Sequence, residues 1–283
     1  MRQYFHVLVF FVTITISCKQ APNQDIVISV LPDSSTVNNT VDSTHLQELN
    51  YLSGGNRFKT FYASPADDKI LHPIVLVIPE WWGLNDYIRY RVKKLAAAGY
   101  IAMGVDMYTE GFNTSDPKVA GEKAGVFYKD IQPAFQHFSA ALAQAKKIPG
   151  ADSSKVAVIG YCFGGAMSLQ MAYAGEPVNA VVSFHGNLPG QAPEQSKLTM
   201  PILVLNGAAD SFISLADIDH FKTALDKIDA KYQFINYPGA KHAFTNPNAD
   251  KIAATYKLDI AYNPAADTAS WTEMLKFLKQ NLK

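Results

Sequence analysis

Cysteine is scarce in this sequence of 283 residues, which contains only Cys18 and Cys162. Two cysteines permit at most one disulfide, and none if Cys18 is modified. An excess of either charge is also absent, since Lys+Arg and Asp+Glu both number 25. The chain therefore has no basic field for nucleic acid and no acidic tract for cations. The composition favours a small molecule as the partner.

Motifs for metals and organic cofactors are missing as well. No His-x-His or Cys-x-x-Cys spacing indicates a metal site, and no Gly-x-Gly-x-x-Gly follows an apolar run as a dinucleotide site requires. We therefore expect the protein to work without a metal or a cofactor.

The N-terminal apolar stretch at 4–16 is too short to cross a bilayer, which takes about 20 residues. It follows Met-Arg and predicts a signal peptide at 1–17. Ile16 and Ser17 before Cys18 resemble a bacterial lipobox, although Thr15 stands where Leu is usual. Lipidation of Cys18 would make this an exported periplasmic or cell-envelope lipoprotein of a bacterium, attached to the membrane only through the lipid. In the alternative interpretation, Cys18 is merely part of an apolar leader that is removed or stays in the cytosol.

The segment 18–50 is rich in Asn, Ser, Thr, Asp and Gln. This composition predicts a flexible tether, because it buries too little apolar surface to become ordered. An additional strand over 25–31 is the alternative. Residues 51–283 are expected to form one catalytic domain with a full core.

Beyond the tether, short and nearly continuous apolar runs alternate with amphipathic segments, as is typical of buried parallel strands and their connecting helices. We predict strands at 73–78, 100–105, 156–159, 180–184, 202–205 and 232–237. We predict helices at 86–98, 131–147, 165–174, 213–228 and 268–282. This alternation predicts an α/β protein with a mostly parallel, twisted sheet and helices on both faces. Its ligands would bind at the carboxyl ends of the strands.

The residues 160–165, Gly-Tyr-Cys-Phe-Gly-Gly, join a predicted strand to a predicted helix. They match a nucleophile elbow with Cys162 in place of serine. The glycines allow strand and helix to approach at a strained turn, and the helix N-terminus directs N–H groups toward the thiol. A buried, unreactive cysteine in a tight turn is the alternative, so further partners are needed.

Such partners follow the next strands in the order that α/β-hydrolases use. Asp210 comes after the predicted strand 202–205, and His242 comes after 232–237. A histidine can carry the thiol proton to a leaving oxygen while an aspartate fixes its tautomer. Singly, Asp210 could be a helix cap and His242 a loop residue.

The end of the first predicted strand carries Glu80 beside two tryptophans. A carboxylate between an apolar strand and indoles is poorly solvated, which raises its pKa and suits it to exchange a proton with a thiol. A surface carboxylate is the alternative. The N–H groups of Trp81 and Phe163 are where an oxyanion hole is expected.

Together these motifs resemble the dienelactone hydrolase family of α/β-hydrolases over about 58–282. The matching segments are Glu-Trp-Trp-Gly-Leu-Asn at 80–85, Ala-Ala-Gly-Tyr at 97–100, Asp-Met-Tyr at 106–108, the elbow at 160–165, Asn-Gly-Ala-Ala-Asp at 206–210 and Tyr-Pro-Gly-Ala-Lys-His-Ala-Phe at 237–244. The resemblance implies an α/β-hydrolase fold and cleavage of an ester or lactone through a thiol acyl-enzyme. It assigns the triad to Cys162, Asp210 and His242, and implies that Glu80 holds the resting thiol and takes its proton when substrate enters.

The arginines with which dienelactone-cleaving members of the family bind a substrate carboxylate are missing. Residues 242–247 contain none, and 108–130 offers only Lys118, Lys123 and Lys129. A lysine supplies charge but not a bidentate fork. A neutral ester, lactone or thioester is therefore at least as good a candidate as dienelactone.

Four further residues beside strand ends are candidates for the substrate pocket: Trp82, Tyr108, His185 and Phe244. Core packing is the alternative for each aromatic residue, and a hydrogen-bonded structural role is the favoured alternative for His185. The apolar stripe of the last helix indicates a core-facing helix but would also suit a dimer, so the oligomeric state stays open.

Two other functions compete with hydrolysis. A surface-anchored binding protein could keep the hydrolase fold without its chemistry, as the tether and the missing arginines would allow. Thiol-based redox or acyl-transfer activity is disfavoured, because no resolving cysteine is present.

Overall fold

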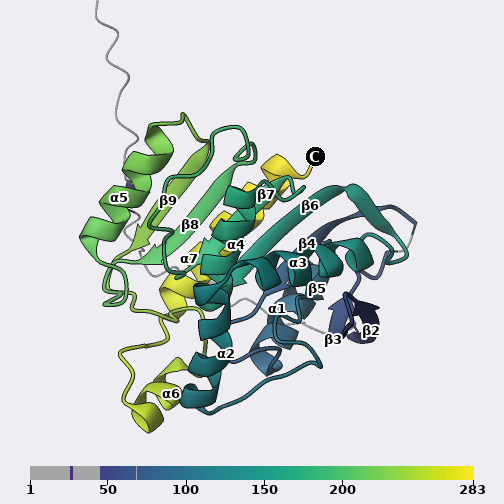
Figure 1. Cartoon of the computed structure of the whole chain (residues 1–283), viewed down its shortest axis with the longest axis horizontal. Helices are drawn as coiled ribbons and strands as arrows, with labels where there is room; N and C mark the ends of the chain where they lie inside the picture. Colours follow the sequence, from purple (N-terminus) through teal and green to yellow (C-terminus); the bar gives the residue numbers. More distant parts are fainter. Residues whose placement is uncertain (1–25, 28–44, 68) are drawn as a thin grey trace, which may run out of the picture.

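A single mixed sheet forms the centre of the computed structural model, which describes residues 26–27, 45–67 and 69–283 (Figure 1). Its strand order is β1-β9-β8-β7-β6-β4-β5-β3-β2. The hairpin of β2 and β3 is antiparallel, and β3 runs antiparallel to β5, while the other neighbours are parallel. The strands are β1 (Ile26–Val27), β2 (Gln47–Ser53), β3 (Asn56–Ala63), β4 (His72–Ile78), β5 (Ile101–Gly104), β6 (Ala151–Tyr161), β7 (Ala180–Phe184), β8 (Ile202–Gly207) and β9 (Tyr232–Tyr237).

Helices cover both faces of the sheet, as predicted. They are α1 (Asp86–Ala97), α2 (Pro117–Lys129), α3 (Gln132–Ala145), α4 (Phe163–Ala174), α5 (Leu215–Asp226), α6 (Ala249–Tyr256) and α7 (Pro264–Asn281). One hydrophobic core contains side chains of α2, α3, α4 and α5, and a second contains side chains of α1 and α7. This is the α/β-hydrolase architecture.

Strand β4 shows why the central strands are apolar throughout. Leu76 points into the first core and its neighbours Val75 and Val77 into the second. Successive side chains of a strand point to opposite faces, so a strand covered by helices on both sides needs apolar residues at every position. The continuous apolar runs of the sequence have this cause.

The predicted strands are all present, and β7 and β9 match their predicted ranges at both ends. The hairpin β2–β3 and the helices α2 and α6 were not predicted. β2 lies at the sheet edge with most side chains exposed, so it has no apolar run to reveal it. α2 contains Gly121 and Gly125, which weaken the helical signal.

The predicted tether over 18–50 needs two corrections. β2 begins at Gln47, ahead of the expected domain boundary at 51. β1 lies inside the alternative strand 25–31 and pairs in parallel with β9, because an open sheet edge supplies backbone partners whatever the local composition. The predicted signal peptide 1–17 and Cys18 lie outside the described residues. Within the part of the chain that is described, no helix combines the length and apolarity needed to cross a bilayer.

Candidate active site

Cys162 occupies a strained turn between β6 and α4. Its backbone has φ 53° and ψ −115°, which is rare for a residue with a side chain. Its N–H is held by two acceptors, the carbonyl of Phe184 at 3.0 Å and Nδ1 of His185 at 3.1 Å. A strained residue fixed by its surroundings is typical of a functional position.

The glycines of the elbow are required because backbones touch there. A Cβ added to Gly160 would lie 1.9 Å from the carbonyl oxygen of Gly164. A Cβ on Gly164 would lie 2.2 Å from the carbonyl oxygen of Ile78, on β4. The turn therefore closes only with glycine at both positions, as the elbow motif predicted.

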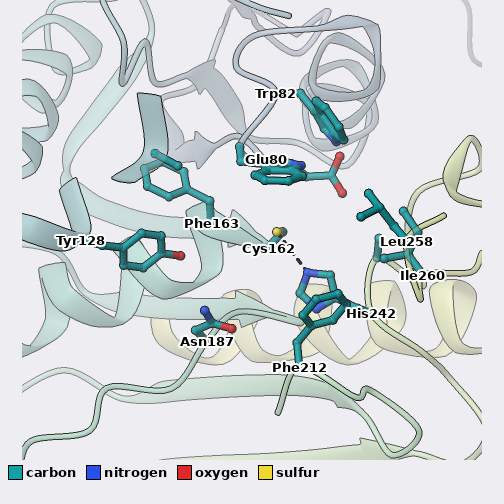
Figure 2. Close-up of a pocket in the computed structure, with 13 residues that line it drawn as sticks. Glu80, Trp82, Tyr128, Cys162, Phe163, Asn187, Phe212, His242, Leu258 and Ile260 are labelled. Carbon is teal, nitrogen blue, oxygen red and sulfur yellow. Dashed lines mark hydrogen bonds between the residues drawn. The ribbon is translucent and has the colours of Figure 1, made fainter. Parts of the chain in front are cut away.

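The side chains of Cys162, His242 and Asp210 form a hydrogen-bonded row (Figure 2). His242 Nε2 lies 3.1 Å from Cys162 Sγ, and His242 Nδ1 lies 2.8 Å from Asp210 Oδ2. Asp210 follows β8 and His242 follows β9, and both side chains are buried. Three residues predicted from separate strand ends thus meet at one edge of the sheet.

The imidazole of His242 is protonated at neutral pH in this arrangement. Burial alone lowers its pKa, but the neighbouring Cys162 sulfur and the Asp210 carboxylate together raise the pKa of His242 to about 10. Protonated, Nε2 donates to the sulfur and Nδ1 donates to Asp210.

Glu80 lies in the same site with only 2% of its surface exposed. Burial raises the pKa of its carboxyl to about 7, against the lowering effect of a 2.7 Å hydrogen bond from Asn246 Nδ2 to Oε2 and of His242 and Arg91. The resemblance implied that Glu80 holds the resting thiol. In the structure the sulfur faces His242 instead, and among the described residues Glu80 has no hydrogen bond to it.

His185 lies beneath the site, completely buried. Its Nδ1 accepts from the Cys162 N–H, and its Nε2 lies 2.7 Å from the hydroxyl of Thr245, which in turn lies 2.7 Å from that of Tyr87. Burial, with the charges of His242 and Arg91, lowers the pKa of His185 well below its usual value, so the ring is neutral and Nε2–H donates to Thr245. It is a hydrogen-bonded structural histidine.

A cavity of about 220 Å³ opens beside Cys162 Sγ. Trp82 lines it as predicted, but Tyr108, His185 and Phe244 do not, because they pack behind the lining. Tyr108 stacks on Phe163 with 5.7 Å between ring centres, and Phe244 packs on His185 at 5.2 Å. The lining residues are Glu80, Trp81, Trp82, Ala124, Tyr128, Cys162, Phe163, Asn187, Phe212, His242, Ala243, Leu258 and Ile260.

Several of these lining residues were missed from the sequence. Tyr128 belongs to α2, which was not predicted, and Leu258 and Ile260 follow α6, which was not predicted either. Asn246, which holds Glu80, had no local signal at all. Phe212 had a signal that was overlooked, since it stands two residues after Asp210 at the same strand end.

Trp81 and Phe163, the predicted oxyanion-hole residues, both line the cavity. Phe163 is the first residue of α4, so its N–H has no partner within the helix. Trp81 comes shortly after the end of β4, the strand that lies beside β6 in the sheet. Across the described residues, no three His, Cys, Asp or Glu side chains are grouped as a metal site would need.

The fold and this site define an α/β-hydrolase. The chain matches the model of the dienelactone hydrolase family over residues 58–282, and it belongs to that family. Membership supports a hydrolase that acts on lactones or esters.

Relatives and solved structures agree with this assignment. A protein of Escherichia coli K12 described as "Putative carboxymethylenebutenolidase" is 27% identical over 88% of this chain and 92% of its own length. A protein of Synechocystis with the same description is 28% identical over 75% of this chain and 87% of its own. The crystal structure of a dienelactone hydrolase-like promiscuous phosphotriesterase from metagenomic libraries superposes with a TM-score of 0.80. It is 28% identical, over 86% of this chain and all of that one.

Proposed function

We propose that the protein hydrolyses a carboxylic ester or lactone with Cys162 as its nucleophile. The observation that carries this proposal is the row of contacts from Asp210 through His242 to the sulfur, at the mouth of a cavity. A thiolate paired with an imidazolium is a competent nucleophile at neutral pH.

In the first half of the reaction, the Cys162 thiolate attacks the carbonyl carbon of the substrate. The carbonyl oxygen becomes an oxyanion, which the N–H groups of Trp81 and Phe163 stabilise. As the tetrahedral intermediate collapses, the carbon–oxygen bond of the ester breaks and His242 Nε2 gives its proton to the leaving oxygen. The products of this half are an alcohol and a thioester on Cys162.

In the second half, the neutral His242 takes a proton from water while the water oxygen attacks the thioester carbonyl. Collapse of this second intermediate breaks the carbon–sulfur bond, releases the acid and restores the thiolate and the imidazolium. Asp210 stabilises the charged ring and fixes its orientation throughout. Glu80, with a pKa of about 7 in the cavity wall, serves to remove a proton from any resting thiol.

The test compares p-nitrophenyl acetate hydrolysis by the wild type with that by Cys162→Ala, Cys162→Ser and His242→Ala. We expect kcat/KM to fall by about a thousandfold or more in each, because the members of such a triad act as a unit. Mass spectrometry should find the acyl group on Cys162.

Equal thermal stability of the variants is the control for folding. Turnover that survives complete alkylation of Cys162 would contradict the proposal. Equal inactivity of the wild type and Cys162→Ala toward a panel of esters, lactones and thioesters would favour the binding-protein alternative.

We also propose that the protein is exported and carries a lipid on Cys18. The support is the apolar stretch 4–16 and the lipobox-like residues at 16–18. The acidic and polar segment behind it then joins the anchor to the hydrolase domain.

A further inference from the structure

The wall of the cavity carries no basic side chain other than His242. Among the described residues that line it there is neither a lysine nor an arginine, and the groups that ionise are Glu80, Tyr128, Cys162 and His242. A substrate carboxylate in this cavity would therefore have no cationic partner in the lining other than His242.

The charge of His242 is already balanced. Its Nδ1 bonds to Asp210 and its Nε2 to the Cys162 sulfur, so both ring nitrogens already have partners. An anion placed beside it would compete with the contacts that the proposed reaction needs.

Two nearby lysines are directed at different partners. Lys123 of α2 lies 4.8 Å from the centre of the Phe112 ring. Lys241, the neighbour of His242, lies 2.6 Å from the carboxylate of Asp259. Neither side chain belongs to the cavity lining.

Arg91 is a buried basic residue that contacts the loop of His242, and it too already has partners. Its Nη2 lies 2.6 Å from Asp267 Oδ1 and 2.5 Å from the carbonyl oxygen of Thr245. Its side chain is 1% exposed and lies outside the lining. Freeing it for a ligand would leave the buried Asp267 without its cationic partner, which is costly.

Glu80 makes the cavity unfavourable for anions. Its pKa of about 7 means that it is partly ionised at neutral pH, and it is almost fully buried. A second carboxylate in the same low-dielectric space is disfavoured by repulsion and by its own desolvation.

Apart from Asn187, the rest of the cavity is lined mainly by apolar and aromatic side chains, which lie on two sides of the sulfur. Figure 2 shows Tyr128 and Phe163 on one side of Cys162, with Phe212, Leu258 and Ile260 on the His242 side. Tyr128 and Phe212 are about half exposed, at 53% and 51%. A ligand that covers these rings gains their burial, at about 25 cal/mol for each Å² of apolar surface.

We propose that the substrate is an uncharged ester or lactone with apolar groups on both sides of the reacting carbonyl, and that esters carrying a carboxylate are rejected. This inference rests on the proposed Cys162-dependent hydrolysis. The selectivity against carboxylates would come from the lack of a cation in the lining, and the preference for apolar groups from the aromatic and aliphatic side chains. Tyr128 is exposed and is therefore suitable for substitution.

The experiment uses the full chain and two esters of one shape, the mono-p-nitrophenyl ester of glutaric acid and its methyl ester, followed by p-nitrophenol release. We expect kcat/KM for the uncharged diester to exceed that for the anionic monoester by about 100-fold. Tyr128→Arg should reduce this ratio by about tenfold relative to the matched neutral variant Tyr128→Gln, and added salt should weaken the reduction.

The outcomes separate the two proposals. Hydrolysis of both esters that depends on Cys162, with the anionic ester turned over as well as the uncharged one, would overturn the substrate class and leave the proposed function standing. An equal ratio in Tyr128→Arg and Tyr128→Gln would also overturn it. The free carboxylate of the monoester expels p-nitrophenolate without enzyme by forming the cyclic anhydride, so the rate without enzyme is subtracted for both esters. Enzyme-dependent release of p-nitrophenol that does not need Cys162 would overturn the proposed function and the inference with it.

Discussion

Cys162 forms hydrogen bonds with two histidines, of which one is neutral and the other is cationic. His185 is neutral and accepts a hydrogen bond from the Cys162 backbone N–H, whereas His242 is cationic and faces the sulfur. The first residue holds the strained backbone in place and the second forms a hydrogen bond with the side chain. Both roles depend on burial. Burial lowers the pKa of His185, whereas at His242 the effects of the Cys162 sulfur and of Asp210 outweigh it and raise the pKa.

His185 can be tested with a matched pair of variants. His185→Asn keeps an acceptor near the position of Nδ1 and tolerates the positive φ of 39°, whereas His185→Leu removes the acceptor. We expect His185→Leu to lower kcat/KM by about tenfold more than His185→Asn and to cost about 1–3 kcal/mol in the free energy of unfolding. Ester hydrolysis and urea unfolding are the measurements. Equal losses in the two variants would show that the acceptor does not matter.

Glu80 predicts a pH dependence of stability. Its pKa is about 7 in the folded protein and near 4.5 when unfolded, so the folded state holds the proton more tightly and loses stability as the pH rises from 4.5 through 7. Glu80→Gln removes this penalty and keeps an acceptor for Asn246. Relative to the wild type, the variant should therefore gain on the order of 2 kcal/mol in its free energy of unfolding between pH 4.5 and pH 8. Urea titrations at both pH values would show no such change if Glu80 were readily solvated.

At the scale of elements, the packing of α4 against β4 and β6 places the sulfur at the sheet edge. α4 begins directly at the elbow, and Gly164 in its first turn lies against the backbone of β4. In α2, by contrast, a Cβ on Gly125 would meet no atom within 4 Å. Two helical glycines therefore have different reasons for their presence.

This difference gives a paired prediction. Gly125→Ala should stabilise the protein by about 0.5–1 kcal/mol, because alanine is the better helix former. Gly164→Ala should destabilise it by about 3 kcal/mol or more, since its Cβ would overlap the Ile78 carbonyl. Thermal and urea unfolding measure both. Stabilisation by Gly164→Ala would mean that the elbow is not closely packed.

At the scale of the whole molecule, a buried ion pair joins the two helices that cover the second face of the sheet to the site. Arg91 of α1 bonds to Asp267 of α7 and to the carbonyl of Thr245, in the loop that carries His242. Asn246, next in that loop, bonds to Glu80 across the cavity. The loop is therefore fixed from both directions, behind by Arg91 and in front by Glu80.

The proposed anchor also belongs to this scale. Cys18→Ser should move the protein from the membrane fraction to the soluble fraction of the exporting cell, because the lipid is its expected attachment. The measurement is fractionation with immunoblotting, together with mass spectrometry of the mature N-terminus. Esterase activity should be the same in both forms. A wild-type protein that is soluble, or that begins at a residue other than Cys18, would contradict the proposal.

The sequence was sufficient to predict a strand or a site residue wherever the pattern was local. The strands β7 and β9 have their predicted bounds. β7 is buried at every position, so it reads as a continuous run. β9 is only partly buried and is marked by its aromatic and β-branched residues. Cys162, Asp210 and His242 could be predicted because each follows its strand within a few residues, and parallel strands bring their carboxyl ends to one edge. Glu80 could be predicted in the same way, since it follows β4 beside two tryptophans, and the resemblance to the family added its expected role toward the thiol.

The features of the site that could not be predicted depend on contacts between segments that are distant in the sequence. Asn246 lies 166 residues from Glu80, and only the folded chain shows that these two side chains meet. Tyr108 and Phe244 follow strands as the pocket residues do, but packing turns them into the core. The order of the functional groups along the chain can be predicted from local sequence, because each group follows the end of a strand. The pocket, the partner of each buried charge and the state of each histidine are set by burial, which only the tertiary structure determines.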